Sequence, residues 1–164
     1  KDIRDLQAVL DMVPENTNAV YAGHSMGGAA GVLTAARDIR ICALVSLAGM
    51  THTAAFVERE FGDVIPDHGF MWEDENFPLS RTFVDDLTLV ASTLPAVEAV
   101  TQPWLLIHGD ADDLVPVQDG IDAFEAATCE KEWLEIAGAG HSFDDASYPL
   151  IISTMDRWLT THFG

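Results

Sequence analysis

Residues Ala19–Gly31 read AVYAGHSMGGAAG, and this stretch decides the fold. Its first four residues are typical of a strand, whereas the residues after Ser25 are small and suit a closely packed helix. Gly23, Ser25 and Gly27 fit the G-x-S-x-G pattern of a sharp strand-to-helix turn. Glycine is needed there because a Cβ would collide where the backbone segments cross. The stretch therefore predicts a short strand that turns into a helix at Ser25.

Apolar segments of strand length recur along the chain and alternate with segments of helical periodicity. The predicted strands cover residues 18–23, 41–48, 104–108 and 131–137. The second of them, ICALVSLA, is an unbroken apolar run, which is typical of a parallel strand covered on both faces. This alternation predicts an α/β fold, a parallel sheet of about four strands flanked by helices.

Residues 51–79 interrupt this alternation. The segment is rich in glycine, proline, acidic and aromatic residues, which predicts an irregular excursion with one short helix. A chain of 164 residues has the length of one domain, so we expect residues 1–164 to form a single domain that contains 51–79 as an insertion.

The composition argues against several classes of partner. Eight Lys and Arg residues against 27 Asp and Glu residues give a formal net charge of −19. Such a charge repels phosphate groups and anionic lipids, so we expect neither nucleic acid nor a membrane as a partner. Cys42 and Cys129 do not make a disulfide scaffold, which favours a reducing compartment and predicts a cytoplasmic location.

The sequence predicts no metal and no cofactor. Asp110, Asp112 and Asp113 lie close together, but Val115 and Ile121 hold the positions that an EF-hand loop gives to Gly and Glu. The two cysteines and six histidines show no spacing typical of a zinc site. Any chemistry is therefore expected from side chains alone.

Ser25 is the candidate nucleophile. A serine hydroxyl is a weak nucleophile at neutral pH, so it needs a general base that is itself oriented by an acid. Two later loops carry such residues: His108–Pro116 reads HGDADDLVP and Gly138–Phe143 reads GAGHSF. Both follow predicted strands, and the carboxyl ends of parallel strands share one edge of a sheet with Ser25.

His141 is the favoured base among the histidines. His24 adjoins the nucleophile on a rigid turn and cannot easily fold back onto its hydroxyl, and His108 ends a strand, which is typical of a structural histidine. The candidate acids are Asp110, Asp112 and Asp113.

These motifs resemble those of the α/β-hydrolase superfamily, and more closely bacterial serine esterases of the cinnamoyl/feruloyl-esterase-like kind. GHSMGG at residues 23–28, H-G-x-x-D-x-x-V-P at 108–116 and GAGH at 138–141 carry the resemblance, which covers essentially the whole chain. It implies that Asp112 is the acid, because the acid of the family lies four residues after the His of the HG pair.

The resemblance implies a serine hydrolase that cleaves carboxylic esters, with small neutral esters as substrates. Met26 would supply a backbone N–H to the oxyanion hole. The insertion 51–79 would be a cap over the active site, whose aromatic residues either line an acyl or aryl pocket or bury the cap against the body. The candidate pocket residues are Phe70, Met71, Trp72 and Phe77. A peptidase, a thioesterase or a perhydrolase with the same three residues remains open, as does a non-catalytic binding scaffold.

In that family, further strands precede the nucleophile, and one of their loops carries the second oxyanion donor. Only 24 residues precede Ser25, and they contain no His-Gly pair. We therefore expect the chain to be the C-terminal part of a longer hydrolase and a poor catalyst alone, since losing one donor costs about 100- to 1000-fold in rate. The strand at 18–23 would then have an unpaired apolar edge, which predicts self-association.

Overall fold

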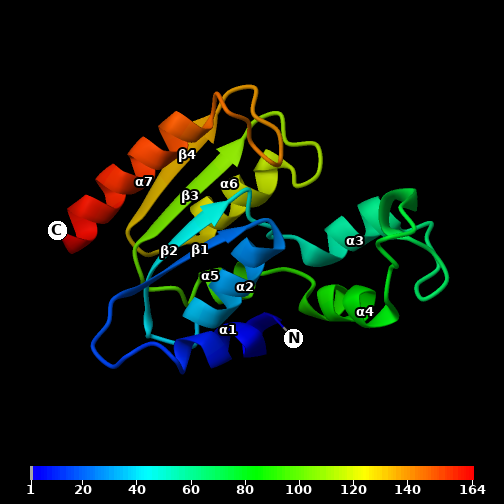
Figure 1. The fold of residues 1–164 in the computed structure, drawn as a ribbon, viewed down its shortest axis with the longest axis horizontal. Coiled ribbons are helices and arrows are strands. Elements are labelled where there is room, and N and C mark those ends of the chain that lie inside the picture. The colour runs from blue at the N-terminus through cyan, green and yellow to red at the C-terminus, as the bar shows by residue number, and fades with distance from the viewer. Residues whose placement is uncertain (1) are drawn as a thin grey trace. The chain divides into compact units, whose positions relative to one another are not determined.

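Four parallel strands form one sheet in the computed structural model of the protein, which describes residues 2–164 (Figure 1). The strands are β1 (Ala19–His24), β2 (Ile41–Leu47), β3 (Trp104–Gly109) and β4 (Lys131–Ile136). They lie in the order β1-β2-β3-β4, and each neighbouring pair is parallel. The predicted α/β fold with a parallel sheet flanked by helices is confirmed.

The chain forms two compact units, which we call the sheet unit and the inserted unit. The sheet unit comprises Lys1–Met50 and Leu94–Gly164, and the inserted unit comprises Thr51–Thr93. The helices of the sheet unit are α1 (Asp2–Leu10), α2 (Met26–Ala35), α5 (Leu94–Val97), α6 (Val117–Ala126) and α7 (Tyr148–Phe163). Those of the inserted unit are α3 (Thr53–Phe61), the 3₁₀ turn η1 (Met71–Glu73) and α4 (Arg81–Val90).

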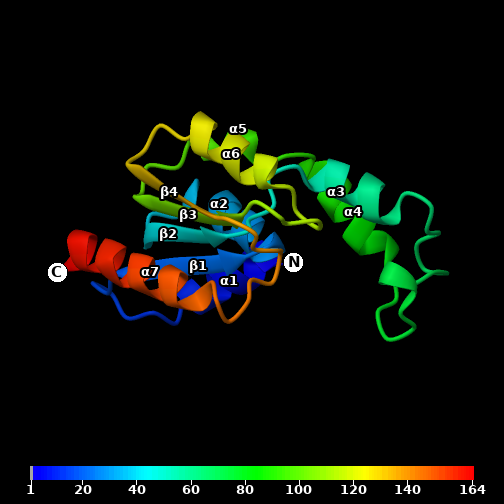
Figure 2. The ribbon, with the colours of Figure 1, turned by 90° about the horizontal axis from the view of Figure 1, so that it is seen from above.

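Helices cover both faces of the sheet, as apolar strands require. Figure 2 shows α7 on one face and α5 and α6 on the other. Side chains alternate between the two cores, because successive residues of a strand point to opposite faces. Leu44 and Leu106 belong to the core beneath α2 and α6, whereas Val45 and Leu105 belong to the core beneath α7.

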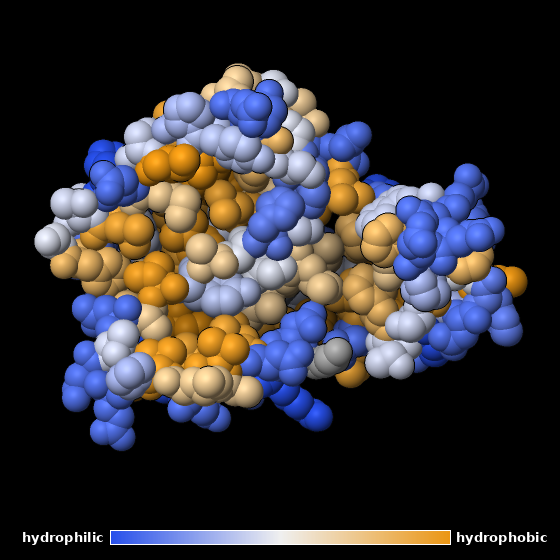
Figure 3. All heavy atoms as spheres, in the orientation of Figure 1, coloured by the Kyte–Doolittle hydropathy of each residue, from blue (hydrophilic) through white to orange (hydrophobic). Residues whose placement is uncertain are grey.

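β1 is a terminal strand of the described sheet, and its side chains are less buried than those of β3. Val20 is 37% exposed, whereas every residue of β3 is buried. Figure 3 shows apolar side chains, in orange, spread over the face of the molecule that is turned to the viewer in Figure 1. Self-association through this edge stays a prediction.

A local signal marks the start of α4. The Phe83 N–H donates to the Ser80 hydroxyl at 3.2 Å, and serine is a favoured residue at the position before a helix. Helix α1 ends at Leu10, and the Val13 N–H closes a turn on the Leu10 carbonyl. The short α5 was not predicted, and α4 belongs to the inserted unit, which continues past Leu79 to Thr93.

Helix α2 packs closely because its first turn is made of small residues. A Cβ on Gly28 would lie 2.7 Å from the Cα of Gly49, in the loop after β2. A Cβ on Gly27 would meet only the Tyr21 hydroxyl, at an ordinary 3.6 Å. A methyl group should therefore destabilise the fold at Gly28 but not at the adjacent Gly27.

Gly28→Ala should lower the free energy of unfolding by about 1–3 kcal/mol, because the clash is with backbone that no rotamer change can move. Gly27→Ala is the matched control, and it should leave that free energy unchanged or raise it by up to about 1 kcal/mol, since Ala favours helix. Urea unfolding followed by circular dichroism measures both. Equal stabilities for the two variants would contradict the packing described here.

Candidate active site

Ser25 joins β1 to α2 with a backbone conformation that residues other than glycine rarely adopt. Its φ is 56° and its ψ is −123°. Three hydrogen bonds hold this conformation: the Ser25 N–H donates to the Leu47 carbonyl at 3.0 Å, and the Ser25 carbonyl accepts from Gly28 at 2.9 Å and from Met50 at 3.1 Å. The predicted strand-to-helix turn is therefore present, and it is strained.

Tyr21 braces this turn from within β1. Its hydroxyl donates to the Gly27 carbonyl at 2.9 Å, and a Cβ on Gly23 would lie 2.7 Å from its ring. Burial, together with the negative charge of Asp2, raises the pKa of Tyr21, so its hydroxyl keeps the proton that it donates. Nothing in the G-x-S-x-G pattern points to this residue.

His141 and Asp112 meet beside the carboxyl ends of β3 and β4. His141 Nδ1 lies 2.9 Å from Asp112 Oδ2, and the Asp112 side chain is fully buried. Asp112 Oδ1 accepts from the N–H groups of Leu114 and Val115 at 3.0 and 2.8 Å. His108 Nε2 lies 3.3 Å from Asp112 Oδ2 and 2.9 Å from the Val115 carbonyl. Carboxylate oxygens of Asp112 accept from His141 and from the two N–H groups, which assigns a proton to His141 Nδ1 and leaves its Nε2 to accept one.

The neighbouring aspartates lie differently. Asp110 Oδ1 accepts the Gly138 N–H at 2.6 Å, and the Ala111 N–H donates to the Ala139 carbonyl at 3.1 Å. Asp113 is exposed. Asp110 thus ties the loop after β3 to the loop after β4, while Asp112 is the aspartate that contacts the His141 ring. Sequence spacing alone left these three residues unresolved.

The His141 loop also contacts the residue before Ser25. His24 Nε2 lies 2.8 Å from the His141 carbonyl oxygen, and the two imidazole rings are 4.6 Å apart between centroids. The Phe143 ring lies 6.2 Å from the His24 ring. Ser25, Asp112 and His141 therefore come from three loops at one edge of the sheet. Sequence reasoning did not identify the role of His24 because its partner is 117 positions away.

The four predicted pocket residues lie in one loop of the inserted unit. The Met71 N–H donates to the Phe77 carbonyl at 2.8 Å, which brings the two ends of this loop together. Phe70, Trp72 and Phe77 are 39%, 54% and 56% exposed. The Trp72 ring also packs on Phe61, 5.2 Å away between centroids. Aromatic surface is available here, and its contact with substrate stays a prediction.

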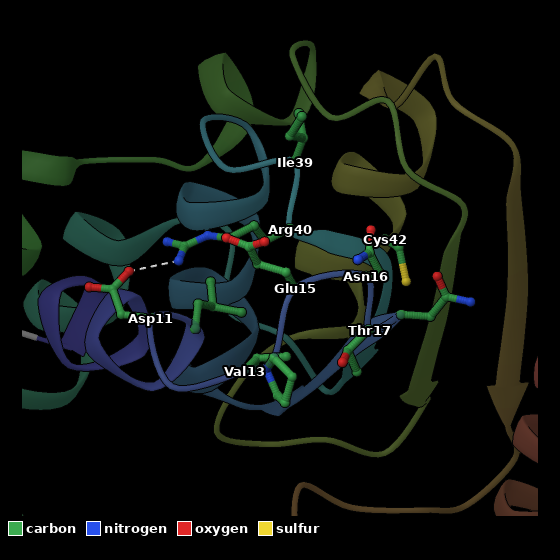
Figure 4. Close-up of a pocket in the computed structure, with 11 residues that line it drawn as sticks. Asp11, Val13, Glu15, Asn16, Thr17, Ile39, Arg40 and Cys42 are labelled. Carbon is green, nitrogen blue, oxygen red and sulfur yellow. Dashed lines mark hydrogen bonds and ion pairs between the residues drawn. The ribbon is translucent and has the colours of Figure 1, made fainter.

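A pocket of about 910 Å³ lies at the opposite end of the strands (Figure 4). Residues before β1, together with Arg40 and Cys42, line it, whereas Ser25 follows the carboxyl end of β1. Arg40 pairs with Asp11 and with Asp38, each at 2.6 Å. The guanidinium is therefore already engaged by carboxylates, and the pocket is separate from the residues discussed above.

Within residues 2–164, no group of three or more His, Cys, Asp and Glu side chains is arranged to hold a metal ion. Cys42 and Cys129 are free thiols, and burial raises the pKa of both. No helix in the described part of the chain is long and apolar enough to cross a membrane.

Comparison with known proteins finds a partial match to an esterase. Esterase LipC of Mycobacterium tuberculosis is 32% identical over 92 residues, which cover 44% of this chain and 23% of LipC. The chain thus spans about a quarter of the curated relative that it matches.

Solved structures agree on the fold. Est1E from Butyrivibrio proteoclasticus superposes with a TM-score of 0.82 at 22% identity, over 97% of this chain and 68% of Est1E. The esterase domain of a Rhodothermus marinus protein gives a TM-score of 0.76 at 21% identity, over 97% and 68%. Another structure of Est1E has ferulic acid bound.

The sequence model of the alpha/beta hydrolase family matches residues 1–150, most of the chain. The strand order, the strained turn and this match lead to one conclusion: the chain belongs to the alpha/beta hydrolase family.

Proposed function

We propose that the protein is a serine esterase that uses Ser25 as nucleophile, His141 as general base and Asp112 as the acid that orients it. The observation that carries this proposal is the 2.9 Å contact between His141 Nδ1 and the buried Asp112 carboxylate, in a loop that is hydrogen-bonded to the residue before Ser25. This chemistry requires a positioned nucleophile, an imidazole held in the right orientation and a carboxylate that holds it.

In the proposed reaction, Ser25 Oγ attacks the ester carbonyl carbon while His141 Nε2 takes the hydroxyl proton. The tetrahedral intermediate collapses, the C–O bond to the alcohol breaks, and His141 returns the proton to the leaving oxygen. Water then attacks the acyl-enzyme by the same proton route and releases the acid. Asp112 stays ionised throughout and stabilises the imidazolium that forms at each attack.

Met26 would provide a donor to the developing oxyanion. Its N–H is the first of α2, and the first N–H groups of a helix have no acceptor within the helix. Because the strained turn at Ser25 sets the start of α2, this N–H is held beside the nucleophile before substrate arrives. A donor that is already in place needs no reorganisation during the reaction.

For the substrate, we propose a neutral ester with an aryl acyl group. The net charge of −19 disfavours anionic substrates. The exposed aromatic side chains of the inserted unit, Phe70, Trp72 and Phe77, offer surface on which an aryl group could stack. Est1E, which shares the fold, has been solved with ferulic acid bound, and this supports the same class of acyl group here.

Ser25→Ala should abolish ester hydrolysis, because the acyl-enzyme cannot form without the hydroxyl. We expect kcat for a short-chain aryl ester to fall by about 10⁴-fold or more, with the circular dichroism spectrum unchanged. The assay uses the full-length protein. Turnover equal to that of the parent would remove Ser25 as the nucleophile.

Asp112→Asn should lower kcat by about 10⁴-fold, because an amide can impose the wrong imidazole tautomer and cannot stabilise an imidazolium. Asp113→Asn is the matched control: it makes the same change of charge at the next, exposed position and should keep kcat within about threefold. The two variants are compared by steady-state kinetics on the same aryl ester. Equal losses in both would contradict the assignment of Asp112.

A further inference from the structure

His24 lies outside the three proposed catalytic residues, yet it makes a direct link between the nucleophile turn and the base. It is the last residue of β1 and directly precedes Ser25, and its Nε2 lies 2.8 Å from the main-chain oxygen of His141. A carbonyl oxygen can only accept a hydrogen bond, so His24 Nε2 carries a proton and donates it. The bond joins two loops that are 117 positions apart in sequence.

We propose that His24 is a positioning residue that holds the His141 loop at the nucleophile, an inference that rests on the proposed function. Asp112 holds one atom of the His141 ring, Nδ1. The ring is also bonded through Cβ to its own main chain, so the position of Nε2 depends on how that main chain is held. His24 holds the main chain of the same residue, and two points of attachment define where the second ring nitrogen lies.

The surroundings of His24 support this role. Its ring packs against the His141 ring at 4.6 Å between centroids, tilted by 41°, and against the Phe143 ring at 6.2 Å. Phe143 has a positive φ of 53°, and its N–H donates to the Gly140 carbonyl at 3.2 Å, so the loop turns back around His141. His24 thus contacts this turn through both a hydrogen bond and its ring.

Because of where His24 lies, loss of its hydrogen bond to His141 should slow the chemical step. Ser25 and His24 are consecutive residues on a rigid turn, so a bond from His24 to His141 sets the base against the nucleophile. Small displacements of a base cost rate because proton transfer needs hydrogen-bond distance. Substrate binding does not require this bond, so KM should change little.

Gln and Asn substitutions at position 24 test the hydrogen bond to the His141 carbonyl. Gln offers a donor that is long enough to reach this oxygen, whereas Asn offers one that is too short. The Gln amide nitrogen extends about as far as His Nε2, so it can donate to the His141 carbonyl, whereas the Asn amide nitrogen is one methylene shorter. Both residues are polar, and position 24 is exposed, so both variants should fold. His162→Asn, near the end of α7, is the control for the loss of a histidine elsewhere.

The test is steady-state hydrolysis of an aryl ester by the full-length protein, with Ser25→Ala measured in parallel. We expect His24→Asn to lower kcat about tenfold with KM within about twofold, and His24→Gln to keep kcat within about threefold. His162→Asn should match the parent. Equal kcat for His24→Asn and His24→Gln, or a loss confined to KM, would overturn the positioning role.

The outcomes for Ser25 and for His24 can be told apart. If Ser25→Ala is inactive while both His24 variants match the parent, the esterase proposal stands and the role of His24 is wrong. If Ser25→Ala is as active as the parent, the proposed function itself is wrong. If both His24 variants lose kcat equally, a ring contact and not the hydrogen bond matters at this position, which also contradicts the inference.

Discussion

The backbone of Ser25 is the constraint on which the rest of the site depends. A φ of 56° with a ψ of −123° is costly for a residue that carries a Cβ, by about 1–3 kcal/mol. Three main-chain hydrogen bonds, to Leu47, Gly28 and Met50, hold it against that cost. The turn ends β1 at His24, and α2 starts at Met26, directly after Ser25. The strain therefore determines both where the hydroxyl lies and where the first helical N–H lies.

Parallel strands then bring the remaining groups to the same place. The carboxyl ends of β1, β3 and β4 share one edge of the sheet, so their loops are neighbours although they are far apart in sequence. Hydrogen bonds lock two of these loops together, from Gly138 to Asp110 and from Ala111 to Ala139. His24 links the third loop to them. Three loops from distant parts of the sequence are therefore connected at one edge of the sheet.

Much of this arrangement could be predicted from the sequence, because its signals are local. The apolar run at Ile41–Leu47 indicates a buried strand, and the glycines around Ser25 indicate the turn. At the start of α4, the Ser80 side chain accepts a hydrogen bond from the Phe83 N–H, a local contact of the kind that serine favours before a helix. In contrast, α5 has only four residues and contains Pro95, which leaves too few residues for a recognisable periodicity.

The parts that could not be predicted depend on contacts between distant segments. Spacing gave three aspartates within four positions, and only the folded loop separates Asp112, beside His141, from Asp110, beside Gly138. His24 and Tyr21 have no sequence signature, because their partners become neighbours only when the turn at Ser25 and the loops after β3 and β4 have folded. The roles of Phe70, Met71, Trp72 and Phe77 depend on a substrate, which sequence patterns do not describe.

The central claim is that one hydroxyl in this chain is unusually reactive. A fluorophosphonate probe reacts covalently with an activated serine, and peptide mapping by mass spectrometry identifies the residue that carries the adduct. We expect a single adduct on Ser25 at neutral pH. An adduct on a different residue, or none on the folded protein under conditions that label a known serine esterase, would contradict the account.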